Sequence, residues 1–372
     1  AMCAKMSENG SPYLRVGTTI YKRVRQPLSS GRRIETLIPW NIETLRQDYG
    51  KDYIAQIPKY DGFCTIPSHT AYRREIDGFL NRYEPISTVP AEGEFPHIRD
   101  FLVHIFGEQQ ELGYDYLQLL YLRPLQRLPI LLLVSGERNT GKTTFLNFLK
   151  LIFEANMTFN TNEDFRSQFN DDWTGKLLVC VDEVLLNRRE DSERIKNLST
   201  ARSYKAEAKG RDRREVEFFG KFVLCSNNER NPVLIEAGET RYWVRRVPPL
   251  TQDNQNLLAD MRRELPGFLF LLHRELSTKE ESRMWFAPRL LATEALRRII
   301  LYNRGKTEAE MLSIAREIME AENLAEYRFD VSDMVNMLEV PLRPSHRAAD
   351  SRGELGTVAR TAYLLPTLHR NL

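Results

Sequence analysis

Short, almost fully apolar segments recur in the middle of the chain, separated by segments with a helical pattern. Residues 129–134 (PILLLV), 177–181 (LLVCV) and 222–225 (FVLC) are such segments. Strands of a parallel sheet have this composition, because helices cover both faces of the sheet and every strand side chain is buried. A helical pattern over 142–153 follows the first segment. The alternation therefore predicts an α/β fold with a parallel sheet.

Amphipathic patterns flank this central region. Residues 13–24 (YLRVGTTIYKRV) alternate apolar and polar positions, which predicts a short hairpin that turns at Gly17. One apolar helical stripe precedes the central region and consists of Ile98, Phe101, Leu102, Ile105 and Phe106. Gly107 is placed to end that helix. Beyond the central region the helical spacing returns, and it predicts helices over 286–303 and 307–322.

The chain of 372 residues exceeds one typical domain, and its patterns change at three points. They predict an N-terminal accessory α+β domain over 1–95 and a helical segment over 96–128 that packs on the core. A parallel-sheet core is expected over 129–250, and a mainly helical region over 251–372. The density of helical segments leaves room for a winged-helix unit in the last region.

Composition limits the function only weakly. The 53 basic and 51 acidic residues give a formal net charge of +2, so nucleic-acid binding must depend on local clusters. No apolar run reaches about 18 residues, so we expect no membrane span. The four cysteines are scattered and form no CxxC pair, which argues against a zinc ribbon and a disulfide framework. A cytoplasmic location fits this cysteine usage.

The strongest chemical signal is the segment GERNTGKT at residues 136–143, a full GxxxxGK[ST] match between a predicted strand and a predicted helix. Glycines let the backbone wrap around phosphate oxygens, and the helix N-terminus adds a positive dipole end. We expect Lys142 to reach the β- and γ-phosphates and the Thr143 hydroxyl to ligate Mg²⁺. The expected contacts of ATP are Gly136, Asn139, Thr140, Gly141, Lys142, Thr143 and Thr144.

Carboxylates and amides follow the other two predicted strands. Asp182 is expected to hold Mg²⁺, directly or through water, and Glu183 to orient and polarise the attacking water. Asn227, favoured over Asn228, is expected to bond both the γ-phosphate and that water. An acidic strand end and an Asn-rich turn also occur without function. These assignments therefore depend on their order behind the 136–143 segment.

With these three elements in this order, the chain resembles the superfamily 3 helicases, whose A, B and C motifs they match. The resemblance is nearest to the primase-helicases of poxvirus type and their phage relatives, and it is specific over 129–250. It implies a P-loop NTPase core of the AAA+-like superfamily 3 type that uses ATP and Mg²⁺. It also implies a DNA helicase that moves on single-stranded DNA as a homo-oligomeric ring, usually a hexamer, in phage, viral or mobile-element replication, beside primases and other replication proteins.

Residues 203–219 alternate apolar and polar positions around a charged turn, which predicts a β-hairpin with a cationic tip. In the family that the chain resembles, the corresponding hairpin projects into the pore of the ring and grips the DNA backbone with a basic residue. Lys209 matches that position best, and Arg211 is the next candidate. Basic tips contact phosphates without reading sequence, so DNA binding is expected to be strongly salt-dependent. A solvated charged hairpin is the alternative.

The family also places an arginine behind the third strand, where it completes the ATP site of a neighbouring subunit. Arg241 fits that position best, and Arg245 and Arg246 are alternates. The apolar residues after Arg241 are expected to pack as a strand. Ion pairing on the surface is the alternative role for this arginine.

Two other functions stay open at this stage. A P-loop ATPase that acts as a nucleotide-driven assembly switch would carry the same ATP motifs and grip no DNA. A non-catalytic scaffold would require all of these motifs to be relics. Primer synthesis is not expected, because the roughly 95 residues before the helical segment show no DxD pair and are too few for the family's primase domain.

Overall fold

The computed structural model describes most of the chain up to residue 304. The described residues are 11–27, 33–167, 173–206, 214–252 and 254–304, with 319, 320 and 323. The chain divides into two compact units. The first comprises 1–233 and 240–296, and the second comprises 234–239 and 297–372. Everything described below belongs to the first unit, except that the last helix continues into the second.

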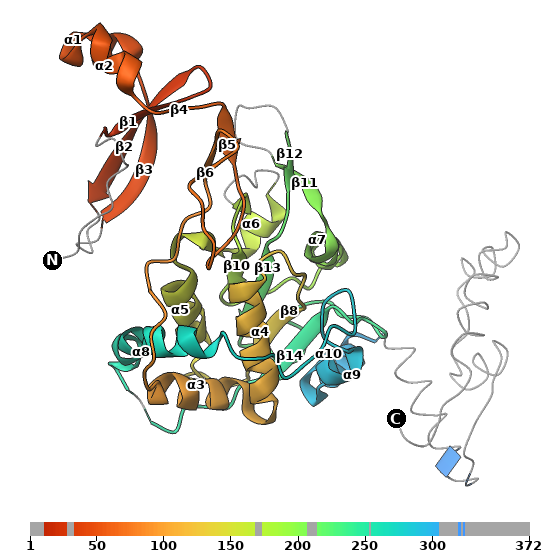
Figure 1. The fold of residues 1–372 in the computed structure, drawn as a ribbon. Coiled ribbons are helices and arrows are strands. Elements are labelled where there is room, and N and C mark those ends of the chain that lie inside the picture. The colour runs from red at the N-terminus through yellow and green to blue at the C-terminus, as the bar shows by residue number, and fades with distance from the viewer. Residues whose placement is uncertain are drawn as a thin grey trace, which may run out of the picture. The chain divides into compact units, whose positions relative to one another are not determined.

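A five-stranded parallel sheet forms the centre of the first unit (Figure 1). Its strands in spatial order are β14 (Tyr242–Arg246), β8 (Ile130–Val134), β13 (Lys221–Ser226), β10 (Leu178–Val181) and β9 (Met157–Asn160). Every neighbouring pair is parallel. The predicted α/β fold with a parallel sheet is confirmed, and the three apolar segments are β8, β10 and β13. β14 is the strand expected after Arg241.

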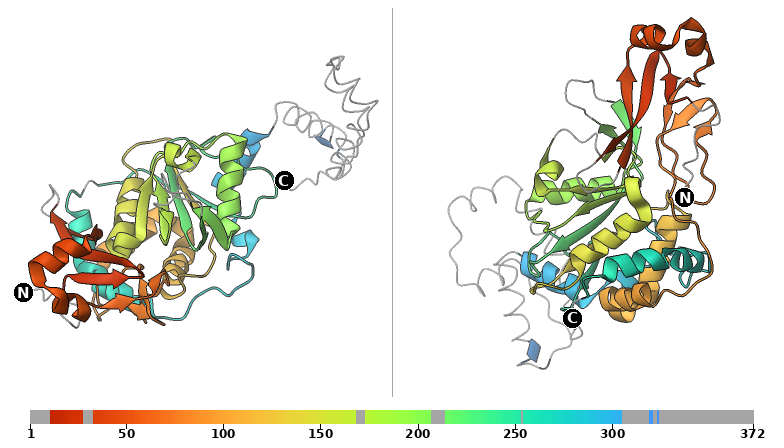
Figure 2. Two further views of the ribbon diagram at one scale, coloured as in Figure 1. Left: turned by 90° about the horizontal axis from the view of Figure 1, so that it is seen from above. Right: turned by 90° about the vertical axis from the view of Figure 1, so that its left-hand side faces the viewer.

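Helices cover both faces of the sheet, as Figure 2 shows with α5 (Lys142–Phe153) on one side and α7 (Arg189–Thr200) on the other. Alternate strand residues such as Leu131 and Val223 belong to the main core cluster. That cluster also contains buried residues of α3 (Pro96–Phe106), α4 (Gln110–Leu122), α5 and α8 (Leu257–Leu271). On the other face, Phe165 of α6 (Asn162–Arg166) contacts the ring of Phe222, with centroids 5.6 Å apart.

The helical predictions are confirmed before the sheet and only partly after it. All five residues of the predicted apolar stripe in α3 are buried, and Gly107, at φ +52°, ends that helix. The single helix expected over 286–303 is wrong, because α9 (Pro288–Leu291) and α10 (Glu294–Asn303) are separate. Thr293 Oγ1 donates to Val244 O (2.6 Å) and accepts from Leu296 N (3.2 Å), so it starts a new helix. The expected helix over 307–322 lies outside the described residues apart from 319 and 320.

The first 95 residues contain both strands and helices. One sheet has the order β3 (Arg33–Trp40), β2 (Thr19–Pro27), β1 (Tyr13–Val16) and β4 (Lys59–Tyr60). A smaller sheet has the order β5 (Gly62–Cys64), β7 (Phe79–Asn81) and β6 (Glu75–Ile76), and the helices are α1 (Ile42–Tyr49) and α2 (Lys51–Gln56). The predicted hairpin is confirmed as β1–β2, with Gly17 at φ +56°. The three predicted domain boundaries stay predictions.

Candidate functional site

The 136–143 segment consists of the loop that follows β8 and the first two residues of α5, Lys142 and Thr143; it is called the 136–143 loop below. Its backbone is left-handed at Asn139 (φ +54°) and Gly141 (φ +82°), a region that side chains with a Cβ adopt rarely. A Cβ at Gly141 would lie 3.1 Å from Phe101 Cε2, so the loop also packs closely against the Phe101 side chain. His104 Nε2 contacts Thr140 O at 3.0 Å. Sequence and packing therefore hold this loop in a tight turn around the helix N-terminus.

Lys142 lies inside this turn. Its ammonium donates hydrogen bonds to Ser135 Oγ (2.6 Å) and Thr140 Oγ1 (2.9 Å), and the residue is only 6% exposed. Burial lowers the pKa of Lys142 from its ordinary value, because the charged form loses solvation. The two hydroxyl oxygens only partly satisfy an ammonium, so an anion brought to this loop would gain a cation already positioned for it.

Two carboxylates follow β10, and one of them contacts the helix that begins at the loop. Thr143 Oγ1 donates to Asp182 Oδ2 (2.7 Å), although the residues are 39 positions apart in the chain. Glu183 is left-handed (φ +57°), and its N–H donates to Asp182 Oδ1 (3.2 Å). Asn162 Nδ2 donates to Glu183 O (3.2 Å) and so fixes the turn from α6.

The turn after β13 separates the two candidate asparagines. Asn228 Oδ1 accepts hydrogen bonds from Arg230 N (2.9 Å) and Asn231 N (3.0 Å), so its side chain is engaged in shaping the turn. Asn227 instead lines the cavity beside the 136–143 loop. The preference for Asn227 over Asn228 stays a prediction, and this geometry supports it.

These groups surround one cavity of about 550 Å³. The residues that line it are Arg138, Asn139, Thr140, Gly141, Lys142, Thr143, Thr144, Asp182, Glu183, Ser226 and Asn227. All the expected contacts of ATP except Gly136 are therefore in the lining. So are the predicted metal ligands Thr143 and Asp182. The arrangement combines backbone donors at a helix N-terminus, one buried cation and two carboxylates.

The oxygen set is compatible with a magnesium ion. Among the described residues, no group of three or more His, Cys, Asp and Glu side chains could enclose a metal. Mg²⁺ usually keeps several waters and is held by one or two protein oxygens together with substrate phosphates. The Thr143 hydroxyl and the Asp182 carboxylate, 2.7 Å apart, fit that mode. They do not fit a closed site made entirely of protein ligands.

Glu229 lies beside this site, where it contacts Gly136, and sequence reasoning missed it. Its Oε1 accepts from the Gly136 N–H (2.6 Å) and from Arg246 Nε (2.8 Å), and so links the loop to the end of β14. Its position shortly behind Asn227 was the only available signal, since an acidic residue in a polar turn has no distinctive pattern.

The three candidate arginines occupy different places. Arg245 is 7% exposed, and its Nη1 donates to Oε1 of the exposed Glu108 (2.6 Å), so its charge is paired within its own chain. Arg246 lies beside the loop of its own chain through Glu229. Arg241 directly precedes β14, and its carbonyl accepts from the N–H of Ile130, the first residue of β8 (2.8 Å).

Arg241 therefore lies at the edge of the sheet opposite the 136–143 loop. The five residues of β8 separate the two edges, about 16 Å at 3.3 Å per residue. That is farther than an arginine side chain extends, so Arg241 and the loop of the same chain do not form one site.

The predicted hairpin between the second and third strands is confirmed. β11 (Ser203–Ala206) and β12 (Arg214–Glu217) pair antiparallel, with Ser203 opposite Glu217 and Ala206 opposite Arg214. The tip with Lys209 and Arg211 lies outside the described residues. Among the described helices, none is long and apolar enough to cross a bilayer.

The central sheet coincides with a recognised sequence family. Residues 133–246, from β8 to the end of β14, match the model of a family of unknown function (DUF5906). The matched span includes the last two residues of β8, the other four strands of the sheet and every candidate site residue. The family match therefore covers the region of the chain that contains the cavity.

A curated relative is the DNA primase-polymerase of the Nitratiruptor phage NrS-1. It is 27% identical over 199 residues, and the match covers 50% of this chain and 27% of the relative. The chain therefore spans about a quarter of the length of that protein. Half of this chain is therefore related in sequence to a phage primase-polymerase.

Solved structures of the NrS-1 C-terminal region are similar in fold. One apo structure has a TM-score of 0.62 at 18% identity and covers 83% of this chain and 79% of that one. A second, the A form of the apo structure, has a TM-score of 0.62 at 19% identity and covers 82% and 74%. At these identities the likeness shows the fold alone.

The different roles of the two asparagines predict different stabilities. We expect Asn228→Ala to lower the free energy of unfolding by about 1–1.5 kcal/mol, because two backbone N–H groups of the turn lose their acceptor. Asn227→Ala should change it by less than about 0.5 kcal/mol, as is usual for a surface position without such contacts. Urea unfolding of both variants measures this. Equal losses in the two variants would contradict the assignment.

Proposed function

We propose that this chain is an ATP-dependent DNA helicase with a P-loop NTPase core of the superfamily 3 type, and that it acts in phage DNA replication. The observation that carries the proposal is the cavity in which Lys142, the Thr143–Asp182 pair and Asn227 meet at one edge of a parallel sheet. The name of the related phage protein, a DNA primase-polymerase, supports the replication context. We propose ATP as the substrate and Mg²⁺ as the cofactor.

The residues of the loop supply the binding step. Backbone N–H groups at the start of α5 point toward the cavity, where phosphate oxygens would accept from them. The Lys142 ammonium would exchange its bonds to Ser135 and Thr140 for bonds to the β- and γ-phosphates. Thr143 and Asp182 would hold Mg²⁺, which neutralises charge on the phosphates when bound. Because these groups are already positioned, little reorganisation accompanies the reaction.

The residues beside the loop supply the hydrolytic step. Glu183 follows Asp182 in the cavity lining, where its carboxylate would orient and polarise the attacking water. Asn227 lines the cavity directly after β13, the strand between β8 and β10, and would bond both that water and the γ-phosphate. The fixed turn at Glu183, held by Asn162, would keep the carboxylate aimed into the cavity.

Arg138 of the same chain lines the cavity, but a second copy of the chain is needed to place Arg241 at this site. Arg241 lies at the edge of its own sheet that is opposite the 136–143 loop. Arg245 is already paired with Glu108. In a closed homo-oligomeric ring, proposed here as a hexamer, Arg241 of one copy would face the cavity of the next and stabilise the charge that develops on the transferred phosphoryl group. Lys209 and Arg211 would contact single-stranded DNA in the pore. Primases and other replication proteins are the proposed partners.

Removing the loop lysine tests the ATP site. We expect Lys142→Ala to lower the ATP turnover by at least about 100-fold and to abolish unwinding of forked DNA, because the cation at the γ-phosphate is lost. Strand displacement with magnesium and ATP, run beside the wild type, measures this. Equal unwinding by both proteins would reject the proposed motor, provided that their melting temperatures agree.

The hairpin tip separates the motor from an assembly switch. The combined Lys209→Ala and Arg211→Ala variant should lose the stimulation of ATP turnover by single-stranded DNA while basal turnover stays within about 2-fold, because the basic tip contacts phosphates and not ATP. Turnover with and without DNA measures this. A switch that grips no DNA would show the same two rates in the variant and the wild type.

Mixing inactive subunits tests the role of Arg241. Arg241→Ala and Lys142→Ala should each be inactive alone, since each removes one half of a shared site. A mixture of the two should regain part of the ATP turnover, because some interfaces pair an intact loop with an intact arginine. Turnover as a function of mixing ratio measures this. A mixture that stays at the sum of the two separate rates would show that Arg241 does not act between subunits.

A further inference from the structure

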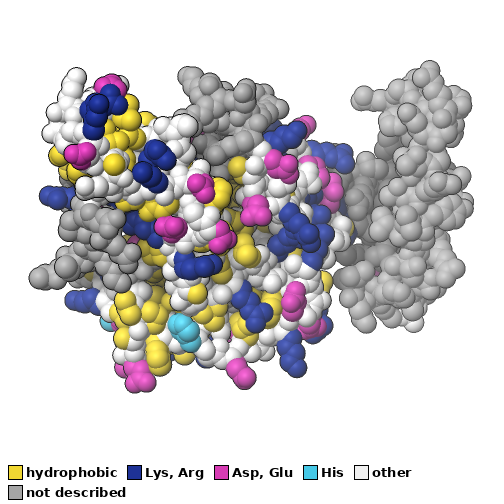
Figure 3. All heavy atoms as spheres, turned by 45° about the horizontal axis from the view of Figure 1, so that its top comes forward, with side chains coloured by type: hydrophobic (Ala, Val, Ile, Leu, Met, Phe, Trp, Pro, Cys, Tyr) yellow, Lys and Arg dark blue, Asp and Glu magenta, His cyan; other side chains and the backbone are white. Residues whose placement is uncertain are grey.

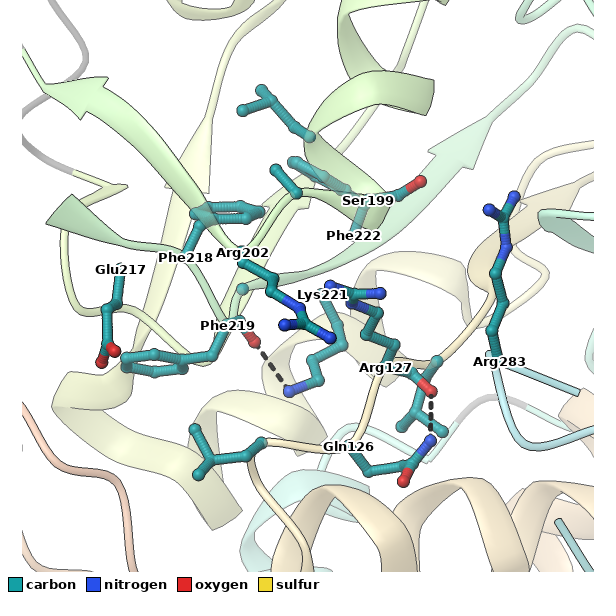
Figure 4. Close-up of a pocket in the computed structure, with 15 residues that line it drawn as sticks. Gln126, Arg127, Ser199, Arg202, Glu217, Phe218, Phe219, Lys221, Phe222 and Arg283 are labelled. Carbon is teal, nitrogen blue, oxygen red and sulfur yellow. Dashed lines mark hydrogen bonds between the residues drawn. The ribbon is translucent and has the colours of Figure 1, made fainter. Parts of the chain in front are cut away.

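A second cavity, of about 400 Å³, lies at the amino edge of the central sheet, away from the 136–143 loop (Figure 4). One wall is the segment that leads into β8, and another is the base of the β11–β12 hairpin with the first residues of β13. The lining residues used below are Arg127, Arg202, Arg283, Lys221, Phe218 and Phe219. The sequence patterns and the proposed catalytic residues make no use of this cavity.

Positive charge gathers here without a matching partner. Within the part of the chain that the structure describes, the side chains of Arg127, Arg202 and Arg283 form no hydrogen bond or ion pair. Glu217 is the single acidic residue in the lining. In Figure 4 the Arg127 and Arg202 side chains extend toward each other over the middle of the cavity. Like charges repel at this range, so the arrangement favours an anion between them.

A buried lysine adds to this charge. Lys221 is 4% exposed, and its ammonium donates to Phe219 O (2.7 Å) and to Pro124 O. Burial lowers the pKa of Lys221 to about 7, because its charged form lacks solvation. A nearby anion would favour the charged form and would itself gain a short-range cation. Lys221 therefore adds a cation to the cavity lining when it is protonated.

The arginines of this cavity differ from several other arginines of the described chain. Over the face drawn in Figure 3, basic and acidic side chains are interspersed. Several arginines have acidic partners, as Arg166 has Asp191 (2.8 Å) and Arg274 has Glu111 (2.6 Å). With a net charge of only +2, an uncompensated arginine cluster is a local feature and not a consequence of overall composition. Guanidinium groups present paired donors that match phosphate oxygens.

The cavity also has an apolar side, and it lies at the base of the β11–β12 hairpin. Phe218 and Phe219 are both nearly buried in its wall, so this side of the cavity is apolar and can pack against the edge of a base. Its volume lies within the roughly 300–1,000 Å³ of small-molecule sites. Arg202 directly precedes β11 and Glu217 ends β12, so the cavity opens at the base of the hairpin. A strand that follows the hairpin from its tip would arrive here.

We propose that this cavity binds one nucleotide of single-stranded DNA, with its backbone phosphate held by Arg127 and Arg202 and its base against the phenylalanine side. The identity of the ligand rests on the proposed function, whereas the anion site itself does not. The phosphate contact extends the DNA path from the hairpin tip to the hairpin base. Free phosphate shares the same chemistry, and the experiment below distinguishes the two sources.

Binding of a labelled dT20 strand without nucleotide, followed by fluorescence anisotropy at several salt concentrations, tests the proposal. The combined Arg127→Gln and Arg202→Gln variant should bind about 10-fold more weakly. Its plot of log affinity against log salt should be shallower by about 0.7 for each phosphate no longer contacted. Arg99→Gln with Arg262→Gln removes the same charge from exposed positions on α3 and α8, and should bind within about 2-fold of the wild type.

Equal DNA affinity and salt slope in the cavity variant and the control variant would overturn the proposal. A second result would also overturn it: millimolar inorganic phosphate raises the melting temperature of the wild type but not of the cavity variant, while the two proteins bind DNA equally well. If the glutamine variant does not fold, Arg127→Lys with Arg202→Lys keeps the charge and loses the paired donors. It should then bind DNA several-fold more weakly than the wild type. ATP turnover is read separately, so failure of the ATPase does not affect this comparison.

Discussion

The candidate site depends on the parallel register of β8, β13 and β10, which brings three polar strand ends to the same edge of the sheet. Two backbone hydrogen bonds continue the sheet beyond the strands, from Ser135 N to Ser226 O (3.1 Å) and from Val184 N to Cys225 O (2.7 Å). They fix the loop, the carboxylates and the amide turn relative to one another. The Thr143–Asp182 hydrogen bond then closes the gap between the first and second of these segments. Burial of the strands on both faces makes this geometry rigid.

The sequence predicted those features that depend on local composition. The three apolar runs could only be buried strands or helix segments, and the glycine-rich loop between a strand and a helix selected the first reading. β9 was missed because only its ends, Met157 and Asn160, are buried, and four residues of half-polar edge strand give no apolar run. The break at Thr293 was missed for a similar reason. A threonine inside an amphipathic pattern caps a new helix only if a partner such as Val244 O is nearby, and that proximity is tertiary.

The same division applies to the site itself. Lys142, Thr143 and Asp182 were predictable, because their motifs combine residue type with position after a strand, and the cavity unites them. Glu229 could not be predicted, because its role depends on the hydrogen bonds that it accepts from Gly136 N and Arg246 Nε, which follow or end other strands of the sheet. The pairing of Arg245 with Glu108 also depends on tertiary structure and could not be predicted. The pattern at Arg245 is that of any arginine near a strand end, and only the contact with Glu108 shows that its charge is already compensated.

The sheet also places two different chemistries at its two edges. The carboxyl edge holds the buried cation and carboxylates of the proposed ATP site, whereas the amino edge holds Arg241, Lys221 and the arginine-lined cavity. β8 and β13 each contribute to both edges and are buried along their whole length. A change in the position of the phosphate loop would therefore be transmitted along the strands more readily than absorbed within them. In the proposed ring, Arg241 would reach the ATP site only from another copy of the chain. Arg241 lies at the same edge of the sheet as the cavity of the proposed DNA path.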